Sequence, residues 1–254
     1  MIAQLQAIRQ DDIITETAYS NWKSLYKISG VAAILIVLTA LFEIIITFLP
    51  GGYVSSETVS DWFTLFQSNW FLGLRNLGLL NIVMTTLGIP MFFALYTAHR
   101  NVNQPSAALA LILSYIGVAV FYATNRAFPM LDLSNQYASA TTDAQRTILL
   151  AAGQAMLSVG ESHTPGTFIG FFLSEAAGII ISIVMLRSKV FNKPSAYFGI
   201  LGFSLLLIFE ICSSFVPTLS NVVLIFAMSG GLLSMVWYVL IARRLFQLVQ
   251  NGKG

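Results

Sequence analysis

The chain has 254 residues, of which 56% are hydrophobic and only 9% are charged. A soluble domain typically carries about 25% charged residues, so this composition excludes an ordinary water-soluble domain and indicates a membrane protein. The net charge of +2 says little by itself, and the arginines are too few and too scattered to favour nucleic acid as a partner. The single cysteine, Cys212, excludes an intramolecular disulfide framework.

The apolar residues fall into six blocks of about 20 residues, which is the length that crosses a bilayer as a helix. Runs such as VAAILIVLTALFEIII are apolar without alternation, and a helix in lipid satisfies its backbone polar groups within the segment. Residues 1–27 contain neither an apolar core nor a small-residue cleavage site, which predicts an uncleaved first span. We therefore predict an all-α fold, a six-transmembrane-helix bundle, with spans at Ile28–Leu49, Phe71–Ala98, Ser106–Arg126, Gly166–Leu186, Ser195–Phe215 and Ser220–Leu240.

The lysines and arginines are unevenly distributed over the predicted connections. If the chain has six spans, one side of the membrane carries Arg9, Lys23, Lys27, Arg100, Arg187, Lys189, Lys193, Arg243, Arg244 and Lys253. The other side then carries only Arg146, with Arg75 and Arg126 at helix ends. Because cytoplasmic segments carry the excess of Lys and Arg, both termini are predicted to be cytoplasmic. The expected organisation is a cytoplasmic N-terminal segment, a six-span membrane domain and a cytoplasmic tail, at residues 1–27, 28–245 and 246–254.

The first predicted outer segment, residues 50–70, has a helical pattern. Its apolar residues lie on one stripe, made of Val59, Trp62, Phe63, Phe66 and Trp70. The stripe has two interpretations. One is a helix that lies in the outer membrane interface with tryptophan at headgroup depth, and the other is a helix packed on the protein's own outer rim.

The second predicted outer segment, residues 127–163, is longer than a simple connection needs to be. Pro129 is expected to end the third span. Thr142 and Gln145 have the spacing of a capping box, so an amphipathic helix is predicted over about Asp143–Val159. Its apolar stripe needs a partner, and we predict a helical outer cap that lies over the mouth of the bundle.

Two short motifs, NQPSA at 103–107 and NKPSA at 192–196, each open a span that runs from inside to outside. They indicate either a parallel duplication of a two-helix unit or a shared helix-start signal, because Pro favours the first helical turn. Two ridges of small residues are typical of close helix packing: Gly166, Gly170, Ser174 and Ala177, and then Ser229, Gly230 and Gly231.

Charged side chains inside spans are costly and by default indicate a functional site. Most of those in this chain fall in the outer half of their spans, beneath the predicted cap. The candidate ligand-binding residues, with their polar neighbours, are Glu43, Arg75, Asn81, Tyr122, Arg126, Glu161, His163, Glu175 and Glu210. The same charges can instead pair to fix the helices, and we predict at least one ion pair between the two arginines and Glu43, Glu210 or Glu161.

Known catalytic and metal-binding patterns are missing from the sequence. The two histidines, His99 and His163, are expected on opposite sides of the membrane, so they cannot hold one haem or one metal together. There is no G-x-S-x-G motif, no Walker A or G-x-G-x-x-G phosphate loop, and no aspartate or mid-span lysine inside a predicted span. No catalytic residue, metal site or cofactor is therefore predicted.

Several stretches of the sequence resemble a family of uncharacterised prokaryotic multi-pass membrane proteins, domain of unknown function 4386. They are GLRNLGLLNI, LDLSNQYASATTDAQRTILLAAGQAML, GTFIGFFL and IVMLRSKVFNK, and the SNQYASATTDAQR core is the most specific part. The resemblance covers roughly residues 28–245. It implies a bacterial or other prokaryotic source and a plasma-membrane location, and it brings no activity, cofactor or catalytic residue.

Three functions fit these observations. The leading hypothesis is a non-enzymatic protein of the lipid bilayer that binds or moves a small molecule or lipid through an outward-facing polar pocket. The alternative is a non-catalytic accessory or structural subunit of a larger membrane protein complex, in which the interior charges are structural. The third is a membrane-embedded enzyme that uses Glu161 or Glu210 as a general base, and no motif supports it.

Overall fold

The computed structural model describes residues 2–49, 58–160, 162–216, 218 and 220–251. The secondary structure elements of this part are all helices, and no strand occurs among these residues. Five helices in it are long and apolar enough to cross a membrane, at Trp22–Phe48, Leu79–Ser139, Phe168–Arg187, Lys193–Phe215 and Val222–Gln250. The predicted all-α, multi-pass membrane class is therefore confirmed.

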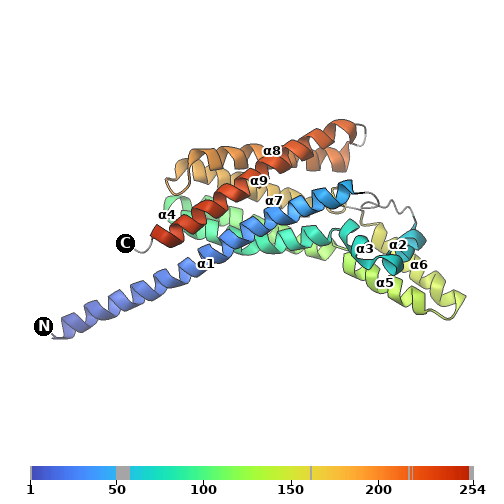
Figure 1. The fold of residues 1–254 in the computed structure, drawn as a ribbon, viewed down its shortest axis with the longest axis horizontal. Coiled ribbons are helices and arrows are strands. Elements are labelled where there is room, and N and C mark those ends of the chain that lie inside the picture. Colours follow the sequence, from blue (N-terminus) through green and yellow to red (C-terminus); the bar gives the residue numbers. More distant parts are fainter. Residues whose placement is uncertain (1, 50–57, 161, 217, 219, 252–254) are drawn as a thin grey trace.

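Five long helices form the membrane bundle. They are α1 (Ile2–Phe48), α4 (Leu79–Thr124), α7 (Phe168–Arg187), α8 (Lys193–Phe215) and α9 (Ser220–Asn251). The main packing contacts run from α1 to α4, α4 to α7, α7 to α8, α8 to α9 and α9 back to α1, so the bundle is a closed ring. Figure 1 shows both chain ends at one end of this bundle and four short helices at the other.

Helix α4 reverses its direction near its middle. Asn103 has non-helical backbone angles, with φ −154° and ψ 77°. The hydroxyls of Thr86 and Tyr122 lie 2.5 Å apart, and the Tyr115 hydroxyl donates to the Ile89 carbonyl at 3.3 Å. A straight helix would separate residues 86 and 122 by about 54 Å, at 1.5 Å per residue. Helix α4 is therefore two antiparallel halves that meet at Asn103.

The repeated NxPSA motif starts a helix at both of its positions. The Ser106 amide donates to the Asn103 side-chain oxygen at 3.3 Å, and the Ser195 amide donates to the Asn192 side-chain oxygen at 3.1 Å. In each case Asn caps the helix and Pro occupies its first turn, where the missing N–H of Pro is harmless. This geometry supports the interpretation of the repeat as a shared helix-start signal.

Four short helices at one end of the bundle form a second packing unit, which we call the cap. They are α2 (Val59–Ser68), α3 (Trp70–Asn76), α5 (Ala127–Ser139) and α6 (Asp143–Leu157). Their apolar side chains form a core of their own, separate from that of the bundle. The predicted capping box at Thr142 and Gln145 is present, and α6 ends two residues before the predicted boundary.

Helix α2 packs on the protein. Trp62 is only 4% exposed, and Val59, Phe63 and Phe66 are also buried, because helices α5 and α6 cover the apolar stripe. The interfacial interpretation is therefore wrong for Trp62, and the rim-packed alternative describes α2. Trp70, which belongs to α3, is 58% exposed.

Three predicted boundaries differ from the structure. The second span begins at Leu79 and not at Phe71, because Gly78 has φ 94° and breaks the helix after α3. Pro129 does not end the third span, which already ends at Thr124. The proline lies in the first turn of α5, a helix that the sequence analysis missed. Helix α1 runs without a break across the expected boundary at residue 27.

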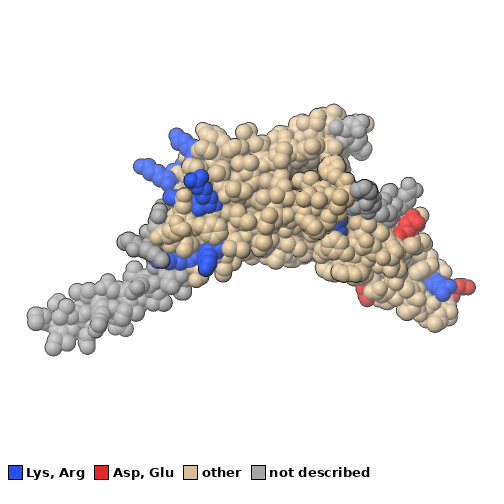
Figure 2. Space-filling view, viewed as in Figure 1, with Lys and Arg blue, Asp and Glu red and all other residues tan. Residues whose placement is uncertain are grey.

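The end of the bundle opposite the cap is basic. Figure 2 shows Lys and Arg side chains gathered there, with an uncharged surface along the middle of the bundle. We call it the basic end; its residues are Lys23, Lys27, Arg100, Arg187, Lys189, Lys193, Arg243 and Arg244, at span ends and at the reversal of α4. This end carries the predicted excess of positive charge.

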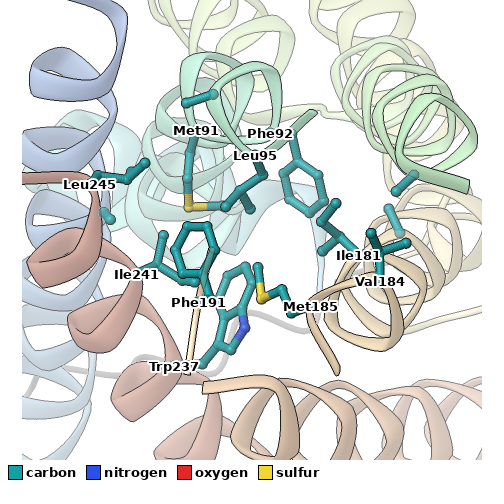
Figure 3. Close-up of a cluster of buried hydrophobic side chains, with 14 of the residues drawn as sticks. Met91, Phe92, Leu95, Ile181, Val184, Met185, Phe191, Trp237, Ile241 and Leu245 are labelled. Carbon is teal, nitrogen blue, oxygen red and sulfur yellow. The ribbon is translucent and has the colours of Figure 1, made fainter. Parts of the chain in front are cut away.

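The bundle core fills the half of the ring nearer the basic end. Figure 3 shows Met91 and Leu95 of α4, Met185 of α7, and Trp237 and Ile241 of α9 packed together. These side chains are fully buried. Close packing of large side chains at this level closes the ring.

We expect the cap core to be sensitive to added volume at Gly153. A Cβ atom there would lie 2.5 Å from Cγ1 of Val59 and 3.0 Å from Cζ of Phe63. Gly153→Leu should lower the free energy of unfolding by roughly 1–3 kcal/mol, as overpacking of a filled core does. Thermal unfolding in detergent measures the change. The control is Ala151→Leu on the exposed face of the same helix; equal melting temperatures of the two variants would contradict the packing.

Candidate functional site

A cavity of about 360 Å³ lies inside the ring. Every bundle helix contributes to its wall, from the half nearer the cap. The wall is mainly apolar, in contrast to the polar pocket predicted from sequence. Its polar residues are Glu43, Asn81, Thr85, Ser114, His163, Ser174, Glu175, Ser234 and Tyr238. An apolar chamber with a few polar groups is typical of a small-molecule site.

Small residues at the level of the cavity explain why the ring is hollow there. A Cβ atom added at Gly88 or Gly231 would meet nothing within 4 Å, and both residues line the cavity. Packing was predicted for the Ser229–Gly231 ridge, and it holds for Gly230, whose Cβ would lie 2.9 Å from the Leu206 amide nitrogen. For Gly231 the prediction is wrong. The ridge on α7 does pack closely, because a Cβ at Gly170 would lie 3.2 Å from Phe121.

The first charged pair joins α3 to α1. Nη2 of Arg75 lies 2.7 Å from Oε1 of Glu43, which confirms the predicted pairing of an arginine with a glutamate. The same guanidinium donates to the Glu43 carbonyl at 3.2 Å, to the Thr47 hydroxyl and to the Asn76 side chain at 3.1 Å. Arg75 is 3% exposed and Glu43 is 36% exposed. Only Glu43 of the two lines the cavity, so the arginine lies behind it.

The second pair joins the segment before α7 to α8. Nδ1 of His163 lies 2.5 Å from Oε2 of Glu210, and Glu210 is fully buried. The Ser213 hydroxyl donates to the His163 carbonyl at 2.9 Å, which holds the left-handed backbone of His163 at φ 63°. Phe171 and Phe209 pack on the imidazole ring, with centroids 4.3 and 4.8 Å away. His163 therefore presents one side to the cavity and the other to Glu210.

The third acidic residue, Glu175 of α7, lines the cavity without a matching cation. It is 8% exposed, and its Oε2 atom has no hydrogen-bond partner among the described residues. A buried carboxyl oxygen that faces a cavity without a partner is a potential ligand contact, because an unpaired buried polar group is costly.

The remaining predicted site residues are dispersed. Asn81 lines the cavity. Tyr122 lies on α4 away from it and contacts Thr86. Arg126 is buried at the start of α5 and does not line the cavity. Glu161 lies outside the described residues.

The cavity also contains polar residues that the sequence analysis missed. Ser114 and Ser174 face it from α4 and α7, and Ser234 and Tyr238 face it from α9. Ser234 and Tyr238 are four residues apart and therefore share one face of α9 with Gly231. This small and polar stripe was the available signal, and of its members only Gly231 entered the sequence analysis, as a packing residue.

The cap helices do not form the roof of this cavity. Among the described residues of the predicted outer segment 127–163, only His163 lines it. Helices α5 and α6 pack on α2 and α3, because the apolar stripes of the four helices cover one another. No group of three His, Cys, Asp or Glu side chains in the described part of the chain is arranged to hold a metal ion.

We expect the effects of substituting Arg75 and Glu43 on the free energy of unfolding to be strongly coupled. Arg75→Met should lower the free energy of unfolding by roughly 3 kcal/mol, the low end of the range for breaking a buried pair, because Glu43 is partly exposed. Adding Glu43→Gln should restore part of this loss, since no lone buried charge remains. Thermal unfolding of both single variants and the double variant in detergent measures this coupling.

The matched control for this pair is Arg146→Met. Arg146 forms an exposed ion pair with Asp143 at 3.7 Å, and loss of such a pair costs less than about 1 kcal/mol. Simple additivity of the Arg75→Met and Glu43→Gln losses would show that the two side chains are not coupled.

One family model matches most of the chain. It is described as "Domain of unknown function (DUF4386)", and it covers residues 31–242. This range includes at least part of every bundle helix and the whole cap, and it confirms the resemblance found in the sequence. No curated protein and no solved structure matched the chain.

Proposed function

The chain belongs to the DUF4386 family, and within this family we propose that it binds a small amphipathic molecule inside the membrane. One observation carries the proposal, namely the cavity of about 360 Å³ that all the bundle helices line. Its volume lies at the lower end of the range of small-molecule sites, about 300–1,000 Å³. Its mainly apolar wall suits an apolar ligand body, and Glu43, His163 and Glu175 supply polar contacts.

Two observations make the alternative functions weaker. The glycine ridge that could serve an accessory subunit as a contact surface is used internally, by α7 against α4. Glu210, the candidate general base, is fully buried and bonded to His163, and it does not line the cavity. A general base must reach the proton that it removes, so binding is the function better supported by this geometry.

The topology belongs to the same proposal. If each half of α4 crosses the membrane, the chain has six spans, with the cap outside and the basic end in the cytoplasm. The gathering of Lys and Arg at the basic end supports this orientation in a plasma membrane. Two hollows at the basic end, lined by Lys189, Arg243 and Arg244 and by Lys23 and Arg100, suit a surface next to anionic headgroups.

Single cysteines test this topology in a Cys212→Ala background. Cysteines at Val102 and Lys189, which are both exposed, should react with a membrane-impermeant maleimide from one side of the membrane. A cysteine at Ser139 should react from the other side. Protection of Val102 at the depth of the bilayer would show that α4 crosses only once, and the six-span topology would be wrong.

Filling the cavity tests the binding function. Gly231→Leu adds a side chain where a Cβ meets no atom within 4 Å, so the protein should fold while the cavity loses volume. Native mass spectrometry of the protein released from nanodiscs should show a co-purified small molecule on the wild type and a loss of at least about tenfold in its occupancy on the variant.

The control for cavity filling is Leu232→Phe. Leu232 is the next residue on α9 and faces outward, so added bulk there leaves the cavity unchanged. Occupancy that is equal in wild type and Gly231→Leu would place the bound molecule elsewhere and remove the support for the proposed function.

A further inference from the structure

We propose that the ligand of the cavity is an organic ammonium ion, a small amine with an apolar body whose charged nitrogen is held by Glu175. This inference rests on the proposed function and names the chemical class of its ligand. Three features of the cavity wall carry it: an unpartnered buried carboxyl, the distribution of cations around the cavity, and the aromatic residues beside Glu175.

Glu175 differs from the other two acidic residues at this end of the bundle. Glu43 is paired with Arg75, and Glu210 is paired with His163. Glu175 is more than nine-tenths buried, lines the cavity, and leaves Oε2 without a hydrogen-bond partner among the described residues. A ligand ammonium at this oxygen would supply the missing hydrogen bond and an opposite charge that stabilises the ionised carboxylate, which an uncharged donor cannot do.

A second carboxyl oxygen has the same requirement. Oε2 of Glu43 is buried and has no hydrogen-bond partner in the described part of the chain, although Oε1 is bonded to Arg75. Glu43 also lines the cavity, and it belongs to helix α1. A primary ammonium carries several N–H donors, so it can bond to Glu175 and still offer donors to other acceptors of the cavity wall.

The lack of Lys and Arg among the described residues of the cavity wall argues against a phospholipid headgroup as the source of the amine. No Lys or Arg is among the described residues that line the cavity, and His163 is already engaged with Glu210. A phosphate group would therefore enter a chamber that contains acidic residues and offers it no opposite charge. The ligand is accordingly a free amine without a phosphate.

Aromatic rings line the same chamber. Phe92, Phe171, Phe203 and Tyr238 belong to its wall. Aromatic faces attract organic cations, by about 0.5–2 kcal/mol depending on desolvation. The same rings provide the apolar surface that the body of the ligand needs.

The experiment compares three probes with the same eight-carbon chain: octylammonium, octanol and octanoate. Thermal unfolding of the protein in nanodiscs, at increasing probe concentration, gives an apparent Kd for each. On the wild type, octylammonium should bind at least about tenfold more tightly than octanol, because a hydrogen bond to a charged group adds that much, and octanoate should bind most weakly. This comparison uses the unchanged protein and needs no variant.

Glu175→Gln then tests the residue. It keeps the shape of the side chain and removes the charge, so the preference for octylammonium over octanol should disappear while octanol still binds. Asp132→Asn, on an exposed face of α5, is the matched control and should leave the preference unchanged. Retained octanol binding shows that the cavity of the Glu175→Gln variant is intact.

The possible results separate this inference from the proposed function. If octanol or octanoate binds the wild type as tightly as octylammonium does, or if Glu175→Gln keeps the preference, the ligand is not an ammonium ion held by Glu175. The cavity remains a binding site in both cases. If none of the probes binds the wild type, and Gly231→Leu changes no co-purified mass, the proposed function itself is wrong.

Discussion

One constraint governs the cap end of this protein: a charge removed from water must find an opposite charge. Arg75 reaches from α3 to Glu43 on α1, and His163 reaches from the segment before α7 to Glu210 on α8. The cap otherwise packs mainly on its own core. Arg75 therefore fixes the cap to α1, and His163 fixes the segment that follows the cap to α8.

The filled and hollow halves of the ring follow from residue size along each helix. On α9, Trp237 and Ile241 fill the level of the core, whereas Ser234 and Gly231 line the cavity about one and two turns before Trp237. Close contacts in the filled half hold the helices together, and the hollow half contributes fewer such contacts. A cavity can therefore exist near the cap without weakening the closure of the ring, because the stabilising apolar contacts lie elsewhere.

Sequence reasoning succeeded where the signal is local. Helix composition, the Thr142 capping box and the need of Arg75 for an acidic partner all depend on a few neighbouring residues or on the cost of burial. It failed where distant segments meet. His163 and Glu210 are 47 residues apart, and no local pattern joins them. Gly231 has the same composition signal as Gly230, and only the surrounding helices make one of them packed and the other open.

The cap core is assembled from two parts of the chain, α2 with α3 and α5 with α6, and membrane helix α4 separates them. During synthesis Phe63 emerges 90 residues before Gly153, its partner in the core. At about 5–20 residues per second this delay lasts roughly 5–18 s. Until α6 is made, the apolar stripe of α2 lacks one of its covering helices, so the cap core closes only after the membrane helix between its two parts has been synthesised.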